Sequence, residues 1–138
     1  MKRALSKDEK EGLVADIASF FSHQDDVVAV YLFGSFLGEG PFSDIDLAVL
    51  LKRPMKRPLN LELSLENTLE RIAGYPVDVR VLNMAPLAFC QSVFKTGRVI
   101  SDLDPNFRSD FQGRMLKEYY DFSPFHRQYL REVMNAPV

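Results

Sequence analysis

Hydrophobic and polar positions near the start of the chain follow the period of an amphipathic helix. Ser6 followed by Glu9 fits a capping box, the arrangement in which two side chains satisfy the free N–H groups of a helix start. Apolar residues then recur at helical spacing, at Leu13, Ile17, Phe20 and Phe21. The pattern predicts a first helix over about residues 7–22.

Three apolar runs predict strands. Residues 27–33 are apolar and partly β-branched, and this run stops at Gly34-Ser35. Residues 36–43 contain two glycines and a proline and should be turn-rich. Residues 44–51 predict a second strand, and the alternating residues 77–82 predict a third. Residues 98–100 fit a short fourth strand.

Helical patterns separate and follow the later strands. A row of apolar residues marks a helix that ends near Gly74: Leu61, Leu65, Leu69 and Ile72. Pro86 can begin another helix and Gly97 can end it. From about Asn106 the chain is predicted to be helical to near its C-terminus, with a break at Ser123-Pro124. This order of elements indicates an α/β (α+β) domain with a small mixed sheet flanked by helices.

Composition narrows the class of protein. The 138 residues, of which 46% are hydrophobic, suit a single domain over residues 1–138, with a core of about 7–100 and a C-terminal helical extension of about 105–136. A net charge of −2 argues against direct nucleic-acid binding over a large surface. Cys90 is the only cysteine, and no apolar run has the length of a signal core or membrane span. We therefore expect a cytoplasmic protein.

Two aspartates lie at the start of the second predicted strand. Asp44 and Asp46 are two residues apart, so their side chains should leave the same face of the sheet. Two carboxylates this close repel each other unless a positive charge lies between them. Hard oxygen ligands suit Mg²⁺, which commonly shares its coordination shell with the phosphates of a substrate.

The predicted topology brings a third carboxylate to this place. The short link between the first two strands favours an antiparallel pair, and the helical link to the third strand favours a parallel, right-handed crossover. If the strands are neighbours, Asp78 at the start of the third strand meets Asp44 and Asp46. The Gly34-Ser35 turn then reaches the same edge of the sheet.

Gly34 and Ser35 have the chemistry of a phosphate-binding turn. Glycine lets the backbone approach a phosphate closely, and a helix that begins at Ser35 would present N–H groups and a hydroxyl to an anion. Phosphates held there, beside metal ions on the aspartates, describe a site for phosphoryl or nucleotidyl transfer with two metal ions. Lys95 and Arg98 remain open either to a contact with a triphosphate or to a surface role.

These residues resemble a known family. Gly34-Ser35, eight further residues and the Asp44-Ile45-Asp46 run, with Asp78 as the third carboxylate, resemble the nucleotidyltransferase motif of the DNA polymerase β superfamily. The short chain is similar to the minimal nucleotidyltransferase (MNT) antitoxins of HEPN/MNT toxin–antitoxin pairs. The spacing of eight residues is shorter than is usual in that group, and Leu37 stands where a basic residue is often found.

The resemblance implies roles for the matching residues and for partners. Asp44 and Asp46 would hold two Mg²⁺ ions, Asp78 would hold the catalytic ion and help to activate the acceptor hydroxyl, and Gly34 and Ser35 would bind the triphosphate of ATP. AMP would be transferred to a tyrosine of a HEPN toxin, which would be neutralised, and the protein could form an oligomer with that toxin.

Two other functions remain open at this point. The chain could be an antitoxin that acts by binding alone, or a small-molecule nucleotidyltransferase of the aminoglycoside-modifying kind. Intact carboxylates favour catalysis over a purely structural role, since three acids close together cost stability without a metal ion.

Aromatic residues dominate the last predicted helix. One stripe has the spacing of a helix face that packs against a core: Phe107, Phe111, Met115, Tyr119 and Phe122. Tyr120, Phe125 and Tyr129 lie outside this stripe and form a hypothetical surface for a partner.

Overall fold

The computed structural model describes residues 4–135, with side chains described for residues 4–121. A short 3₁₀ helix, η1, follows the first strand, and the other elements have the order predicted from the sequence. The elements are α1 (Lys7–Phe21), β1 (Val27–Phe33), η1 (Ser35–Leu37), β2 (Ile45–Leu51), α2 (Leu59–Ala73), β3 (Val77–Val81), α3 (Leu87–Thr96), β4 (Arg98–Asp102) and α4 (Pro105–Asn135).

The predicted boundaries hold closely, with one error in the last helix. The capping box at the start of α1 is confirmed, because the Ser6 N–H donates to Glu9 Oε1 (3.0 Å) and the Glu9 N–H donates to Ser6 Oγ (3.1 Å). The break predicted at Ser123-Pro124 is wrong, since α4 is one helix across these residues. A proline inside a helix removes only one backbone hydrogen bond, so it weakens a helix without always ending it.

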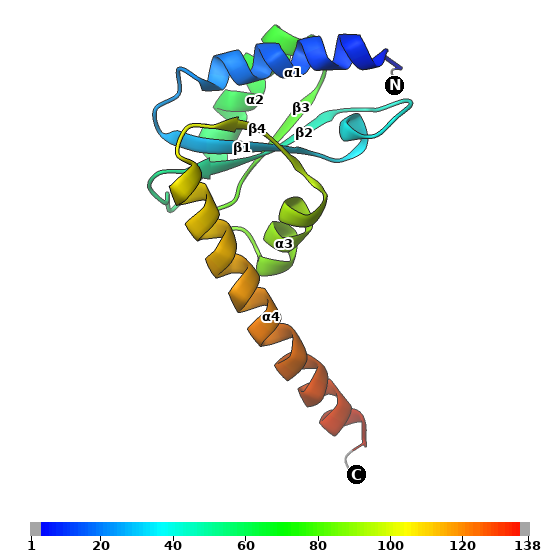
Figure 1. Ribbon diagram of the computed structural model, residues 1–138, viewed down its shortest axis with the longest axis vertical. Helices are drawn as coiled ribbons and strands as arrows, with labels where there is room; N and C mark the ends of the chain where they lie inside the picture. The colour runs from blue at the N-terminus through cyan, green and yellow to red at the C-terminus, as the bar shows by residue number, and fades with distance from the viewer. Residues whose placement is uncertain (1–3, 136–138) are drawn as a thin grey trace.

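The four strands form one mixed sheet in the order β3-β2-β1-β4 (Figure 1). β1 is antiparallel to both β2 and β4, whereas β2 and β3 are parallel and are joined through α2. The neighbour relations on which the sequence argument depended are therefore confirmed. They follow from the connections, because a short loop suits an antiparallel pair and a helical crossover suits a parallel one.

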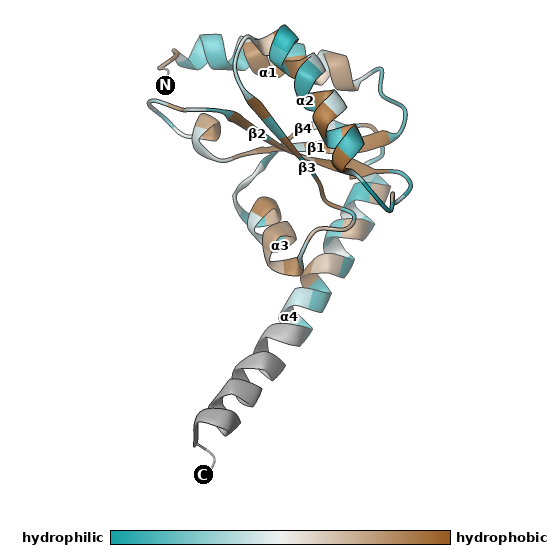
Figure 2. Cartoon of the chain, turned by 180° about the vertical axis from the view of Figure 1, so that it is seen from behind, coloured by the Kyte–Doolittle hydropathy of each residue, from teal (hydrophilic) through white to brown (hydrophobic). Residues whose placement is uncertain are grey.

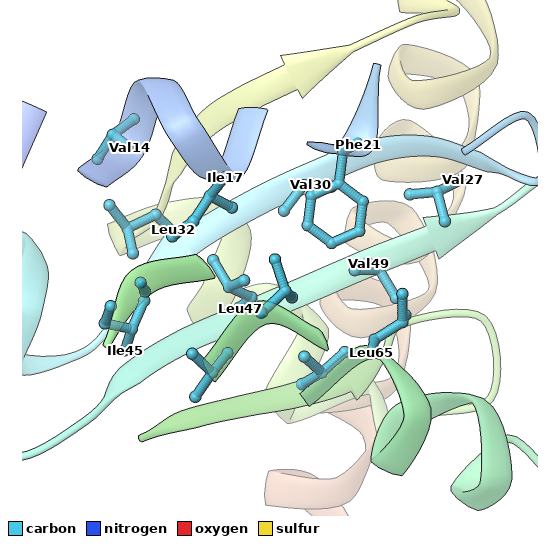
Figure 3. Packing of buried hydrophobic residues seen from close by; sticks show 14 of the residues in the cluster. Val14, Ile17, Phe21, Val27, Val30, Leu32, Ile45, Leu47, Val49 and Leu65 are labelled. Carbon is cyan, nitrogen blue, oxygen red and sulfur yellow. The ribbon is translucent and has the colours of Figure 1, made fainter. Parts of the chain in front are cut away.

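Helices α1 and α2 cover one face of the sheet (Figure 1). Ile17 and Phe21 of α1 pack with alternate residues of the central strands, among them Leu47 of β2 (Figure 3). Leu65 and Leu69 of α2 complete this cluster. In Figure 2 the central strands are largely hydrophobic, while hydrophilic residues colour much of α1 and α2, as expected for amphipathic helices on a sheet.

Ile72 does not belong to the buried face of α2 that its spacing predicted. Its side chain is 40% exposed, whereas Leu65 and Leu69 are buried. The row of residues four apart continues to Ala73, which is 7% exposed, and Ile72 is therefore rotated away from the sheet.

Helices α3 and α4 lie against the other face of the sheet. Cys90 and Val93 of α3 and Phe111 of α4 are buried in a second cluster together with residues of β1 and β2. Side chains alternate between the faces of a strand, so each central strand supplies one set of residues to each cluster. The sheet is thus covered on both sides, which explains the nearly continuous hydrophobic runs of β1 and β2.

Polar side chains attach α4 to the sheet beside this second cluster. Tyr31 of β1 donates its hydroxyl hydrogen to Gln112 Oε1 (2.9 Å), and Arg108 Nε lies 2.9 Å from Asp102 Oδ2. The other oxygen of Asp102, Oδ1, is buried without a hydrogen-bond partner among the residues described. Arg108 is therefore the cation that compensates a largely buried carboxylate.

The core role predicted for the stripe on α4 is confirmed at its first positions. Phe111 is buried, and Phe107 and Met115 pack against the same cluster. Tyr120 is 60% exposed. The side chains of Phe122, Phe125 and Tyr129 lie outside the described residues. Within the described chain, no helix combines the length and the apolar character that crossing a bilayer requires.

Replacing Arg108 should loosen the attachment of α4. In Arg108→Met the partly buried Asp102 carboxylate loses its ion pair, so we expect the free energy of unfolding to fall by about 1–3 kcal/mol. Chemical denaturation followed by circular dichroism measures this change. Arg114→Met removes an exposed arginine of the same helix and is the matched control. Equal losses in the two variants would show that the Arg108–Asp102 pair contributes nothing.

Candidate active site

Two acidic side chains lie at the start of β2, on the face covered by α3. Asp46 is the second residue of β2, and Asp44 comes immediately before the strand rather than within it. Ile45, between them, is fully buried in the cluster on the opposite face. Phe33, the β1 residue opposite Asp46, has its ring 5.7 Å from that of Phe89 in α3. Asp44 and Asp46 therefore face the α3 side, as their spacing predicted.

The parallel pairing of β2 and β3 brings the third aspartate to the same place. Asp46 and Asp78 are register partners, and the residues on either side of Asp78, Val77 and Val79, pack into the opposite face. Asp78 Oδ2 lies 3.6 Å from Arg80 Nε, and both side chains are partly exposed. Sequence analysis predicted that the three aspartates converge at one edge of the sheet, and this register is the feature that brings Asp78 beside Asp46.

Both the backbone conformation at position 34 and the neighbouring Asp46 carboxylate favour glycine there. The φ of 80° and ψ of −161° of Gly34 lie in a region that other residues rarely adopt. A Cβ atom at this position would also overlap Oδ2 of Asp46 and lie 3.0 Å from its Cγ. Glycine is thus required both by the backbone and by the approach of Asp46. Ser35 follows as the first residue of η1 and is exposed.

The electrostatics of the cluster are those of a site for a cation. Burial, together with the negative charges of Asp44 and Asp78, raises the pKa of Asp46 to about 6, against a partial lowering by Arg80. The charged form of Asp46 is therefore unfavourable in the protein alone. Three carboxylates in this setting form the donor set that hard divalent cations such as Mg²⁺ prefer.

The carboxylates are not preassembled around a metal position. Among the described residues, no three His, Cys, Asp or Glu side chains are arranged as a ready-made metal site. Asp44 Oδ1 instead accepts a hydrogen bond from Ser43 Oγ (3.1 Å), and Asp78 faces Arg80. Side-chain rotation away from these partners would free oxygens of Asp44 and Asp78 for a shared cation.

Lys10 of α1 supports the turn that follows Gly34-Ser35, a role that sequence analysis did not identify. Its ammonium group donates to the carbonyl oxygens of Phe36 (3.1 Å), Gly38 (2.8 Å) and Gly40 (3.4 Å). It also lies 5.2 Å and 5.3 Å from the ring centroids of Phe36 and Phe42. These contacts join residues far apart in the chain, so no local pattern could have revealed them.

Two arginines lie near the site. The sequence could have placed Arg80, but it left the contact of Arg98 open. Arg80 lies two residues beyond Asp78, and the alternation of β3 would have placed it on the face of the aspartates. Arg98, open to a triphosphate contact on sequence grounds, forms a bidentate pair with Glu11 of α1 (2.6 and 3.1 Å). In this structure its guanidinium serves a surface ion pair.

Comparison with known proteins places this geometry in a family. The family model described as polymerase beta, nucleotidyltransferase matches residues 15–106. The chain is also similar to a solved structure of a tri-AMPylated Shewanella oneidensis HEPN toxin in complex with an MNT antitoxin. The TM-score is 0.71 at 21% identity, and the match covers 91% of this chain and 98% of that one.

Two further solved structures support the same fold. The toxin–antitoxin MntA-HepT matches with a TM-score of 0.65 at 19% identity, and a toxin–antitoxin complex with AMP-PNP matches with 0.65 at 22% identity. Each covers 94% of this chain and 99% of the other chain. At these identities the likeness shows a shared fold. No curated protein sequence matches the chain.

Removing the charge of Asp46 should stabilise the protein when no metal ion is present. Because the pKa of Asp46 is raised from 3.8 to about 6, the native state binds this proton more tightly than the unfolded chain does. Stability therefore falls as pH rises through this range. In EDTA at pH 7, Asp46→Asn should gain about 1 kcal/mol, a value reduced for the partial exposure of the carboxyl group.

The measurement is the free energy of unfolding of both proteins between pH 4 and pH 8. The advantage of Asp46→Asn should shrink as the pH approaches 4, because the wild-type carboxyl group is then protonated in the native state and carries no charge there. Asp16→Asn, at an exposed position of α1, is the control and should show no such trend. A constant difference across the pH range would contradict this account of the cluster.

Replacing Lys10 should destabilise the turn between β1 and β2. In Lys10→Met three carbonyl groups lose a charged donor, so we expect the free energy of unfolding to fall by about 1–3 kcal/mol. Limited proteolysis should cut residues 34–43 faster in this variant. Lys7→Met, at an exposed position one turn earlier in α1, should change neither quantity. Proteolysis at the wild-type rate would show that Lys10 does not hold the turn.

Proposed function

The chain belongs to the polymerase β nucleotidyltransferase family, and we propose that it transfers AMP from ATP to a tyrosine hydroxyl of a HEPN toxin, thereby acting as an antitoxin. The observation that carries the proposal is the register of the sheet. Asp46 and Asp78 lie opposite each other on adjacent parallel strands, and Gly34 approaches Asp46 from β1 at the same edge.

In this proposal each part of the edge has one task. Asp44, Asp46 and Asp78 hold two Mg²⁺ ions, whose chemistry is to neutralise the phosphates and lower the pKa of the attacking hydroxyl. The backbone turn at Gly34 approaches the triphosphate beside the carboxylates, and the exposed Ser35 hydroxyl donates to a phosphate oxygen. A carboxylate oxygen of Asp78 takes part in removing the proton of the acceptor hydroxyl.

The bonds exchanged define the reaction. The acceptor oxygen forms a bond to the α-phosphorus of ATP, and the bond from that phosphorus to the bridging oxygen of the pyrophosphate breaks. The electron pair leaves with pyrophosphate, and the acceptor proton passes to solvent through the Asp78 carboxylate. Catalysis of this kind consists mainly of positioning and charge stabilisation, which a cluster of carboxylates and a phosphate-binding turn can supply.

The choice of acceptor rests on the structural neighbours. The toxin of the Shewanella oneidensis complex is tri-AMPylated, and its partner is an MNT antitoxin. Another toxin–antitoxin complex of the same fold contains AMP-PNP, an analogue of ATP. This chain shares that fold along 91–94% of its length. A HEPN toxin is therefore the acceptor that the comparisons favour.

The cost of the carboxylate cluster favours catalysis over binding alone. Burial and, after it, the negative charges of Asp44 and Asp78 raise the pKa of Asp46, so the charged cluster costs stability in the absence of a cation. An antitoxin that only covered its toxin would gain nothing from this arrangement. Transfer to a small molecule uses the same chemistry and differs only in the acceptor, which the experiment below identifies.

The test is transfer of label from [α-³²P]ATP with Mg²⁺, in a lysate of the source organism, by wild type and by Asp44→Asn/Asp46→Asn. We expect a labelled protein band in the wild-type reaction and a loss on the order of 100-fold or more in the variant, because charge stabilisation at the phosphates is removed. Asp16→Asn is the matched control and should label at the wild-type rate. [γ-³²P]ATP should give no band that depends on Asp44 and Asp46, since the γ-phosphate leaves with pyrophosphate.

The other outcomes assign the other functions. Label found only in small molecules would exclude the toxin as acceptor and indicate a small-molecule nucleotidyltransferase. A folded protein that binds a purified HEPN toxin but transfers no nucleotide would indicate an antitoxin that acts by binding. Mass spectrometry of a labelled band identifies both the protein and the modified side chain.

A further inference from the structure

Three glutamates of α2 close the free edge of the sheet. They are spaced four residues apart and face β3, the strand at this edge. Each carboxylate accepts a hydrogen bond from a backbone N–H of β3: Glu62 from Val81 (2.9 Å), Glu66 from Val79 (2.8 Å) and Glu70 from Val77 (3.1 Å). These N–H groups point away from β2, so no strand of this sheet pairs with them.

The spacing of the two elements makes this arrangement possible. Four residues of an α-helix rise about 6.0 Å, and two residues of a strand rise about 6.6 Å. A row of glutamates four apart on α2 therefore stays in step with alternate N–H groups of β3, with the two elements running in opposite directions. Hydrogen bonds to a charged acceptor are stronger than those between neutral groups, so the row holds β3 firmly.

Asp78 lies between two of the N–H groups that this row holds. Val79, which follows Asp78, is bound by Glu66, and the carboxyl groups of Glu66 and Asp78 interact with each other. Burial and, after it, the neighbouring Asp78 raise the pKa of Glu66, whereas the hydrogen bond from Val79 lowers it. Val81, bound by Glu62, is separated from Asp78 by both Val79 and Arg80.

We propose that Glu66 is a positioning residue for Asp78: by holding the Val79 N–H, it fixes the part of β3 that keeps Asp78 opposite Asp46. This inference rests on the proposed function, in which Asp78 binds a metal ion and acts on the acceptor hydroxyl. Glu66 itself touches neither substrate nor reacting atom. Its carboxyl group also lies near that of Asp78, but the positioning role is exerted through the backbone hydrogen bond from Val79, on the far side of the strand from β2.

Two substitutions at position 66 separate the hydrogen bond from the charge. Glu66→Gln keeps the length of the side chain and a carbonyl oxygen that accepts from Val79, but it removes the charge. Glu66→Asp keeps the charge but is one methylene shorter and does not reach Val79. Glu62→Asp is the matched control, because Glu62 makes the same bond from the same helix and is similarly half-buried.

The first measurement is the kcat for AMP transfer and the KM for ATP. Glu66→Asp should lower kcat roughly 10- to 100-fold, the order expected when a reacting group is displaced by a fraction of an ångström to an ångström. Its KM for ATP should stay within about twofold of wild type, since Gly34 and Ser35 lie in the turn after β1 and not on β3. Glu66→Gln should restore most of kcat, and Glu62→Asp should remain close to wild type.

The second measurement does not depend on transfer. Binding of Mn²⁺, followed by electron paramagnetic resonance, should be weaker in Glu66→Asp than in wild type or Glu62→Asp, with Asp78→Asn as the reference for loss of that ligand. Thermal unfolding of all variants shows whether Glu66→Asp and Glu62→Asp lose similar stability, as equal bonds predict. A kcat loss confined to Glu66→Asp then separates positioning from general destabilisation.

Several results would overturn the inference. Equal kcat losses in Glu66→Asp and Glu62→Asp would show that the row is a structural brace alone. An active Glu66→Asp with an inactive Glu66→Gln would show that the charge matters and the bond to Val79 does not. If the wild type transfers no nucleotide, the proposed function fails, and unchanged Mn²⁺ binding in Glu66→Asp would then overturn the role of Glu66 independently.

Discussion

The parallel pairing of β2 with β3 is the interaction on which the candidate site depends. It sets Asp46 opposite Asp78, and it exists because α2 carries the chain back across the sheet to the same end. Shifting the pairing by one residue would turn Asp78 to the opposite face, where α1 and α2 pack. Val77 and Val79 oppose such a shift, since both are buried in the cluster on that face. The buried valines of β3 thus stabilise the register that sets Asp78 opposite Asp46.

Concentrating negative charge at one edge has consequences for the surrounding backbone. Asp46 takes space that a side chain at position 34 would need, which restricts that position to glycine. The turn that begins at Gly34 has several exposed residues. Lys10 supports this turn by donating hydrogen bonds to its carbonyl oxygens. Phe36 and Phe42, buried beneath this lysine with ring centroids 4.8 Å apart, attach the same turn to the core. The carboxylates are therefore surrounded by a backbone that is held from several sides.

The parts of this arrangement that the sequence could predict are those with a local pattern. Apolar runs located the strands, loop lengths gave their directions, and alternation put Asp44 and Asp46 on one face. The neighbour relation of β2 and β3 could be inferred, because few topologies fit two strands joined by one helix. Lys10 and Glu66 could not be assigned in this way. Each binds backbone atoms that are distant in sequence, and although the glutamates of α2 recur every four residues, that spacing does not show which backbone groups they bind. The break predicted at Pro124 was wrong for a related reason. Proline disfavours the interior of a helix, but the loss of one backbone hydrogen bond is too small to end α4.

The two faces of the sheet therefore contribute to the site in different ways. The acidic side chains face α3, whereas the groups that hold their backbone come from α1 and α2 on the other side. Lys10 and Glu66 contact main-chain atoms, so their effect on the site is transmitted through the position of the backbone. Substitution of Asp44, Asp46 or Asp78 removes a candidate ligand, whereas substitution of Lys10 or Glu66 changes the contacts that hold the neighbouring backbone. Because a strand transmits a displacement of its backbone to both faces, the helices that form the hydrophobic core also set the geometry of the carboxylates.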